Sequence, residues 1–564
     1  MHPDEWLEIH TYDPQKLEIA QAVLEEVRAG RDVMAAIKHH PLPGGGYLAK
    51  YTLVSAYHQL IQNGDWAEEP DMLSRIRMKP GRSLSGVTTV TVLTQPYPCP
   101  GKCIFCPTDA RMPKSYLPDE PGAARAFQND FDPYLQVRSR LDSYLAVGHP
   151  IDKIELLILG GTWSSYRRDY QEHFVKCCFD AMNEVESATL AEAQARNETA
   201  PHRNVGLVIE TRPDEITPKE LAWLRYLGVT KVQMGAQSLD DNILNVNQRG
   251  HTVSDTQRAC ALLRAAGFKI VLHWMPNLLG ATTDSDRADF ARLWQESGDG
   301  LGLCPDEIKI YPTQLLQNAD LYDYWKNGLY HPYSTDDLIN LIADIKPTIP
   351  EYCRVNRVIR DIPSQHVVEG NRRTSLRQDV LIELGRRGQA CRCIRCREVG
   401  GRTVDPALLT LDDRVYRAAC AEEHFLYYVT PDDLIAGYLR LSLPEGAGPC
   451  DELHDTPGSK LKPSQGWIDF PDLAGAALIR EVHVYGQSLA VGAEQSGAAQ
   501  HIGLGTALLQ KAAELAKQHG FRRLAVIAAI GTRRYYEARG FQRGELYMVM
   551  ELSSNLPTPH NPFT

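Results

Sequence analysis

The stretch Cys99-Pro-Gly-Lys-Cys103-Ile-Phe-Cys106 places three cysteines within eight residues. Two metal centres fit this spacing. Three thiolates can hold three irons of a 4Fe-4S cluster and leave the fourth iron open to another ligand. They can also supply three of the four ligands of a structural zinc ion. The next histidine is His149 and the next cysteine is Cys177, whereas a zinc knuckle normally finds its last ligand close by. The spacing therefore favours the iron–sulfur cluster.

A continuous β-branched run at residues 87–94 directly precedes this cysteine loop. Such a run predicts a buried strand of a parallel sheet, with the loop at its carboxyl end. Further strand-like runs alternate with helical ones, at residues 154–159, 205–210, 231–234, 269–273 and 307–311. Repeated strand–helix units predict a parallel barrel. Because about six strands are visible, we predict an α/β fold with an open (β/α)6-type partial barrel.

Several of the predicted strands end in glycines or polar residues. The Gly160-Gly161-Thr162 turn would let the backbone approach a ligand closely. A single polar strand end is usually structural, but several around one barrel mouth indicate a binding site. The other polar residues of this kind are Glu210, Gln237, Arg249 and His273.

With its cysteine loop, its Gly-Gly-Thr turn, Gly235-Ala-Gln-Ser238 and Arg249-Gly-His251, this region resembles the radical-SAM superfamily. The resemblance implies that S-adenosylmethionine binds the open iron of a 4Fe-4S cluster and is reduced to a 5′-deoxyadenosyl radical. The cluster ligands would be Cys99, Cys103 and Cys106. In this half of the chain we expect cofactor binding by Lys153, Gly160, Gly161, Thr162, Glu210, Gln237, Arg249 and His273.

A second cluster, Cys391-Arg-Cys393-Ile-Arg-Cys396, lies in an arginine-rich segment. This compact spacing resembles a structural zinc site with one ligand missing. Cys304 is our candidate for the fourth ligand, because it precedes the last predicted barrel strand and could meet this segment.

The C-terminal region changes character. Residues 424–429, 434–442 and 477–485 read as strands. Gln500-His-Ile-Gly503-Leu-Gly505 then opens a helix, where glycines and free amides can hold a pyrophosphate. With the following strand at residues 524–530, this pattern resembles the GNAT acetyltransferase superfamily and implies acetyl-CoA binding by Gln500, Gly503 and Gly505. The closing helix carries Tyr535 and Tyr536, one of which would lie near the thioester sulfur. The Gly/Pro/Ser-rich insertion at residues 444–466 predicts a loop that gates this site.

Charge is distributed unevenly along the 564 residues. The net charge of −11 argues weakly against a nucleic-acid partner. However, residues 74–108 hold five lysines or arginines and no acid, and residues 352–402 hold twelve arginines against five acids. Arginine-rich segments favour phosphate recognition, although a solvated surface is the alternative. We expect RNA contacts from an exposed basic loop, at Arg75, Arg77, Lys79 and Arg82.

Over roughly residues 70–550, the chain resembles the catalytic-subunit family of Elongator in a prokaryotic single-chain form. Asp132-Pro-Tyr-Leu-Gln-Val-Arg-Ser-Arg and the stretch around Arg357 carry this resemblance. It implies four segments: helices (1–72), a radical-SAM domain (73–375), a cysteine-rich linker (376–411) and an acetyltransferase domain (412–564).

The family resemblance implies a tRNA uridine acetyltransferase. A radical would take hydrogen from the acetyl methyl group of acetyl-CoA, and the resulting carbon would add to C5 of the wobble uridine, leading to carboxymethyluridine. The partners would be the tRNA anticodon stem-loop, acetyl-CoA and an external electron donor. The alternatives are a protein lysine acetyltransferase with a structural iron–sulfur domain and a non-enzymatic RNA-binding subunit. Thirteen clustered cysteines and the lack of a long apolar run predict a cytoplasmic protein without a membrane partner.

Overall fold

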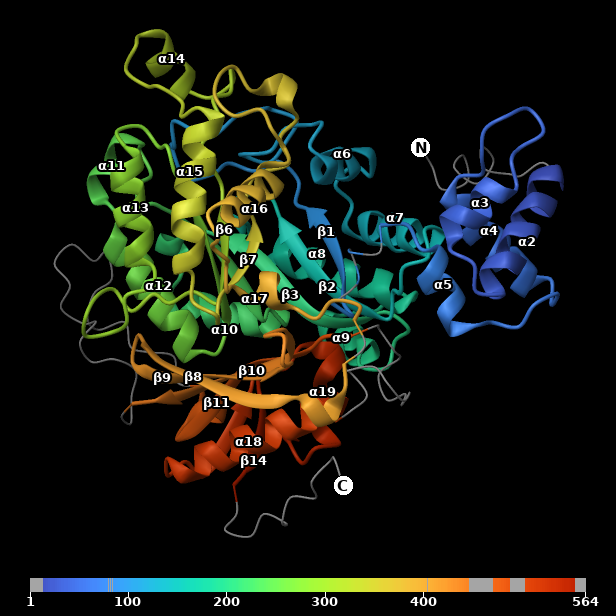
Figure 1. Cartoon of the computed structure of the whole chain (residues 1–564). Helices are drawn as coiled ribbons and strands as arrows, with labels where there is room; N and C mark the ends of the chain where they lie inside the picture. Colours follow the sequence, from blue (N-terminus) through green and yellow to red (C-terminus); the bar gives the residue numbers. More distant parts are fainter. Residues whose placement is uncertain are drawn as a thin grey trace.

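The computed structural model contains a helical unit, a parallel sheet wrapped by helices and a second sheet (Figure 1). It describes residues 14–79, 81, 83, 85–402, 404–445, 470–486 and 503–552. Arg82, Gln500 and residues 446–466 of the expected gate lie outside the described residues. No described helix is both long enough and apolar enough to cross a membrane.

The N-terminal helical unit has its own core. Val23, Leu24 and Val27 of α2 are buried together with Leu53 and Tyr57 of α4. The helices expected in this segment thus pack their apolar faces against one another. The unit consists of α2 (Pro14–Arg28), α3 (Val33–His39), α4 (Lys50–Gln62) and α5 (Pro70–Ile76).

The first sheet is the expected open barrel. All seven strands are parallel and follow one another in chain order. The sequence pattern did not indicate the seventh strand, because its four residues, Arg-Val-Asn-Arg, contain only one apolar side chain. The strands are β1 (Thr88–Leu93), β2 (Lys153–Leu159), β3 (Arg203–Thr211), β4 (Lys231–Gln237), β5 (Lys269–Trp274), β6 (Glu307–Ile310) and β7 (Arg354–Arg357).

Helices cover the outer face of this sheet (Figure 1). Ile154 and Leu156 of β2 share a core with Phe174 and Phe179 of α8, as expected for a parallel sheet whose crossovers pack on its faces. The helices of this region, of which α14 lies at the barrel mouth, are α6 (Pro121–Gln128), α7 (Pro133–Ala146), α8 (Arg168–Asn183), α9 (Leu190–Asn197), α10 (Pro218–Leu227), α11 (Asp241–Val246), α12 (Val253–Ala265), α13 (Thr283–Arg292), α14 (Leu321–Lys326), α15 (Thr335–Ile345), α16 (Leu376–Arg386) and α17 (Ile394–Arg397).

The second sheet has the order β13-β14-β12-β11-β10-β9-β8. Its neighbours are antiparallel except β11 and β12, which are parallel. The expected domain boundary at residue 412 falls inside β8, so this sheet begins two residues earlier. Its elements are β8 (Thr410–Ala418), β9 (Ala421–Val429), β10 (Ile435–Pro444), β11 (Ala476–Val484), α18 (Leu504–Gln518), β12 (Arg523–Val526), α19 (Arg533–Glu537), β13 (Gln542–Arg543) and β14 (Met548–Glu551).

The second sheet packs under the amino ends of the barrel strands (Figure 1). Lys269, the first residue of β5, donates to Glu481 Oε1 of β11 at 2.9 Å. Arg354, the first residue of β7, donates to the Tyr485 hydroxyl at 2.8 Å. Because the cysteine loop follows the carboxyl end of β1, the second sheet and the cysteines lie at opposite ends of the barrel.

Candidate functional site

The cysteine loop meets two other strand ends at the barrel mouth. Cys99 Sγ lies 3.5 Å from Thr162 Oγ1, beyond β2. Arg249, beyond β4, donates from Nη1 to Cys103 Sγ at 3.5 Å. The sulfurs of Cys99, Cys103 and Cys106 do not all lie within 4.8 Å of one another. A cubane places each thiolate on a different iron, so this wider arrangement suits a cluster better than one zinc ion.

Some buried polar atoms around this loop have no hydrogen-bond partner among the described residues. Arg212 is held by Asp214 at 2.9 and 3.0 Å and by the Arg249 carbonyl at 2.9 Å. Its Nη1 nonetheless has no hydrogen-bond partner among the described residues, and neither does Gln237 Oε1. Unsatisfied buried polar groups are costly, so their convergence fits a bound polar molecule such as S-adenosylmethionine.

The two glycines after β2 are required by the fold of the mouth. Gly160 has a φ of +141°, and a Cβ atom there would collide with Thr94 Oγ1. Gly161 has a φ of +95°, and its Cβ would stand 3.3 Å from the Lys114 carbonyl. The turn thus packs its backbone against Thr94, after β1, and Lys114, where a side chain would not fit.

Glu210 and His273 line the cavity that opens at the barrel mouth. The Tyr116 hydroxyl donates to Glu210 Oε2 at 2.8 Å. His273 Nε2 lies 3.1 Å from Gln233 Oε1, to which Lys309 Nζ also donates at 2.5 Å. Burial, together with the charge of Lys309, lowers the pKa of His273 well below its usual value. Burial also lowers the pKa of Lys309 to about 8. The imidazole is therefore neutral at pH 7.

The sequence patterns did not indicate three residues that line this site: Tyr116, Gln233 and Lys309. Gln233 and Lys309 lie inside predicted strands, where the only signal was a polar residue within an otherwise apolar run. Tyr116 comes from the loop after the cysteines, where nothing in the sequence distinguishes it.

One cavity of about 690 Å³ runs from the cysteine loop to the second sheet. Its wall includes Cys106 at the mouth, Thr91 and Val208 along the strands, and His483 and Tyr485 of the second sheet region. A six-residue strand spans about 20 Å, so the two ends of the cavity are separated by about that length. The barrel interior therefore connects the two halves of the protein.

The second sheet opens where the cavity reaches it. β11 and β12 pair only from Ala476 to Ile479, after which β11 continues alongside β10. Gly503, with a φ of +73°, is the N-cap of α18, and a Cβ atom on Gly505 would stand 3.7 Å from Val484, the last residue of β11. The free amides of a helix start favour a bound anion there.

The two tyrosines take different places. A Cβ atom on Gly505 would stand 2.6 Å from the Tyr535 hydroxyl, so Tyr535 points at the start of α18. The Arg539 guanidinium covers the Tyr535 ring at 3.6 Å. Tyr536 is buried, with its ring 5.6 Å from that of Phe541. Of the pair, Tyr535 is therefore the one that faces the predicted pyrophosphate site.

Lys153 lies at the opposite end of the barrel from the cysteines. It begins β2 and pairs with Arg203 of β3, against which Gly531 of the second domain packs. Burial lowers the pKa of Lys153. Lys153 therefore lies near the second sheet, away from the expected cofactor residues at the barrel mouth.

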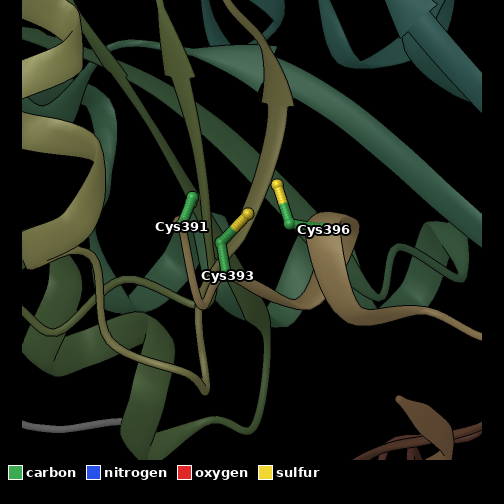
Figure 2. Close-up of side chains that lie close together, drawn as sticks. All are labelled: Cys391, Cys393 and Cys396. Atoms are coloured by element: carbon green, nitrogen blue, oxygen red, sulfur yellow. The ribbon is translucent and has the colours of Figure 1, made fainter. Parts of the chain in front are cut away.

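Cys391, Cys393 and Cys396 gather at one point (Figure 2). Their sulfurs lie within 4.8 Å of one another, close to the roughly 3.8 Å between thiolates that share one zinc ion at about 2.3 Å. The buried Lys346 ammonium lies 4.0 Å from Cys396 Sγ. The structure does not bring Cys304 to this group. Its sulfur points to the carbonyl of Gln295, at 3.7 Å, because β8 packs over this part of the chain.

The basic residues before β1 differ in their exposure and hydrogen bonding. Arg75 and Lys79 are exposed. Arg77 instead donates to the Gly148 carbonyl at 3.0 Å and to Ser83 Oγ at 3.1 Å, and burial lowers its pKa. Arg77 thus differs from the expected exposed loop, because it ties this segment to the barrel.

Much of the arginine-rich stretch at residues 352–402 forms internal ion pairs. Arg360 binds Glu120, and Arg397 binds Asp433. Seven of the twelve arginines are nonetheless exposed: Arg357, Arg372, Arg373, Arg386, Arg392, Arg395 and Arg402. Part of the positive charge that suggested phosphate recognition therefore holds elements together, and the rest lies at the surface.

Comparisons with known proteins agree with this architecture. Models of the radical SAM superfamily, of its C-terminal domain and of the GNAT acetyltransferase family match residues 97–293, 305–384 and 402–541. The tRNA uridine(34) acetyltransferase of Dehalococcoides mccartyi is 41% identical over 84% of this chain and 99% of that protein. Human Elongator complex protein 3 is 32% identical over 85% of this chain and 87% of that protein.

A solved structure extends the comparison to the fold. Archaeal Elp3 from Methanocaldococcus infernus, with an N-terminal deletion, matches with a TM-score of 0.69 and 34% identity, over 83% of this chain and all of that one. Sequence, fold and site geometry thus agree, and the chain belongs to the radical-SAM and GNAT family that includes the tRNA uridine(34) acetyltransferases and Elongator complex protein 3.

Proposed function

We propose that this protein uses acetyl-CoA and S-adenosylmethionine to modify C5 of the wobble uridine of tRNA, forming carboxymethyluridine. The single cavity between the cysteine loop and the opening in the second sheet carries this proposal. Two sites at opposite ends of one barrel can act on one substrate if its reacting group passes between them. The family membership supports the same reaction class.

At the mouth, Cys99, Cys103 and Cys106 would hold a 4Fe-4S cluster. When bound, the cluster and S-adenosylmethionine supply a radical, and the protein binds and orients the reactants. Arg212 and Gln237 present unsatisfied polar atoms to the ligand, and the neutral His273 offers a hydrogen-bonding imidazole without adding charge. An external electron donor is the implied partner.

At the other end, the start of α18 would bind the pyrophosphate of acetyl-CoA through Gly503 and Gly505. Tyr535, next to Gly505, is placed to donate to the ligand that enters this opening. Lys153 would contribute from the amino end of β2. These residues would hold the acetyl donor at the end of the barrel opposite the cysteine loop.

Outside the cavity, Arg75 and Lys79 would contact tRNA phosphates, since both are exposed. The Cys391, Cys393 and Cys396 triad would bind a structural zinc ion. Its place beside β7 and α17 suits a joint between the barrel and the second sheet, because Glu398 just beyond the triad binds Arg354 at 2.8 Å.

The test is mass spectrometry of nucleosides from tRNA incubated with the protein, S-adenosylmethionine, a reductant and acetyl-CoA labelled in its acetyl group. Label in a carboxymethylated uridine is expected. Thr91→Phe should block the cavity and abolish the product, while Thr91→Ser keeps the cavity open and the product intact. Acetylated protein lysines that survive Cys103→Ala, without any labelled uridine, would instead favour a protein lysine acetyltransferase.

A further inference from the structure

Two histidines and a carboxylate converge where the outer strands of the second sheet meet the end of α18. Glu422 and His424 belong to β9, and His519 directly follows α18. His424 Nε2 lies 3.2 Å from Glu422 Oε1, and His519 Nε2 lies 3.4 Å from the same oxygen. In Figure 1, β8 and β9 lie between the barrel above and α18 below, so this group is remote from the barrel mouth.

Neighbouring groups fix which nitrogen each imidazole presents. His424 Nδ1 lies 2.7 Å from Asp413 Oδ2 of β8. His519 Nδ1 lies 2.9 Å from the Leu515 carbonyl. Both partners are acceptors, so each Nδ1 can carry a proton, which would leave each Nε2, turned toward Glu422, to bind a metal ion. A carboxylate or carbonyl behind each imidazole is the arrangement that orients histidine ligands of metals.

We propose that His424, His519 and Glu422 bind a divalent metal ion of the zinc class. Ligands at 2.0–2.1 Å from a tetrahedral zinc ion stand roughly 3.3 Å apart, and the two measured edges are 3.2 and 3.4 Å. All three ligand atoms lie within 4.8 Å of one another. Two imidazoles and one carboxylate form a recognised zinc-ligand set that leaves a fourth position for water or another ligand.

The surroundings favour a cation at this point. Asp413 and Glu422 bring two carboxylates, and the carbonyl end of α18 adds the negative end of the helix dipole. His424 is buried, whereas the Glu422 and His519 side chains are 37% and 42% exposed, so the fourth position faces solvent. The ion would fasten the end of α18, whose other end begins the predicted acetyl-CoA site, to β9.

A similar cluster in the N-terminal unit differs in its surroundings. Glu26, His39 and His40 also lie within 4.8 Å of one another. There the Arg31 guanidinium donates to Glu26 Oε2 and lies 2.9 Å from His39 Nδ1. The Arg31 guanidinium thus already pairs with the Glu26 carboxylate, so this cluster is a matched control for zinc binding.

The test is zinc stoichiometry of the full-length holoprotein, by isothermal titration and metal analysis. The wild type should bind one equivalent more than His519→Ala and than Glu422→Gln, while His39→Ala should equal the wild type. Asp413→Asn should retain the site with roughly 10- to 100-fold weaker affinity, since it disturbs only the orientation of His424.

Cobalt identifies the ligands directly. The Co²⁺ bound in the wild type but not in His519→Ala should show visible absorption without the thiolate charge-transfer band of a cysteine site. Circular dichroism establishes that both variants are folded. Equal zinc stoichiometry in the wild type and His519→Ala would overturn the proposal and leave a histidine–carboxylate ion-pair network, as would a thiolate band in the difference spectrum.

Discussion

The Arg480 guanidinium donates two hydrogen bonds, of 2.8 and 2.7 Å, to the Asp306 carboxylate across the boundary between the two sheets. Both side chains are completely buried. Arg480 also donates to Glu423 at 3.0 and 2.8 Å. Because buried charges are tolerated only when paired, this contact sets how the second sheet sits under the barrel, and hence where the cavity meets it.

Breaking this pair should destabilise the protein. Arg480→Met leaves Asp306 and Glu423 as buried carboxylates with fewer partners, so we expect a loss of about 3–5 kcal/mol in the free energy of unfolding. Denaturant unfolding measures it. Arg386→Met removes an exposed ion pair with Glu383 and should cost much less, because solvent screens exposed ion pairs. Equal losses in the two variants would contradict the structural role of Arg480.

The cluster assignment predicts a selective loss of iron. Cys103→Ala should remove the visible absorption of an anaerobically reconstituted 4Fe-4S cluster, because three thiolates are its only protein ligands. Cys177→Ala, on the outer helix α8, should keep the full iron content. Zinc without iron in the wild type would refute the cluster.

The contact between Gly505 and Tyr535 predicts a compensating pair of substitutions. Gly505→Ala puts a methyl group 2.6 Å from the Tyr535 hydroxyl, so it should weaken acetyl-CoA binding at least tenfold. Adding Tyr535→Phe removes the hydroxyl and should restore part of the affinity, as titration calorimetry can show. Gly385→Ala, with open space around its Cβ, serves as the control. No rescue in the double variant would mean that Tyr535 does not set the shape of this site.

The basic segment predicts a salt-dependent effect on RNA. Arg75→Glu with Lys79→Glu should weaken tRNA binding and reduce the slope of log affinity against log salt by roughly two, since about one counterion is released per phosphate contact. Filter binding at several salt concentrations gives this slope. Arg77→Ala should instead lower thermal stability, because its guanidinium holds Gly148 and Ser83. An unchanged slope in the double variant would make the segment a solvated surface.

Asp286 predicts a pH dependence of stability. Burial raises its pKa to about 7, against the lowering effect of hydrogen bonds from Asn277 and Tyr333. The unfolded chain releases this proton near pH 4 and the folded chain near pH 7, so stability should fall by about 4 kcal/mol across that interval and then level off. Asp286→Asn should remove this decline in denaturant unfolding. Asp284→Asn, at an exposed carboxylate, should keep it, and a decline that persists in Asp286→Asn would contradict the assignment.

Local sequence determined the elements and the identity of many chemical groups. The β-branched run before Cys99 predicted β1, and Gly160 and Gly161 predicted a turn, where both residues have positive φ. These features depend on neighbours in the chain, where sterics and periodicity act directly.

Tertiary structure alone decided which distant groups meet. Nothing near Tyr535 in the sequence showed that its hydroxyl reaches Gly505 while Tyr536 packs into the core, since this depends on how α19 lies against α18. The same holds for Arg77, which looked like an RNA contact and binds Gly148, and for Cys304, whose sulfur faces Gln295 and not the triad. His424 and His519 lie about a hundred residues apart in sequence, and only the packing of α18 against β9 gives them a common carboxylate. A contact between distant residues is set by the whole fold, because each partner is placed by a different element.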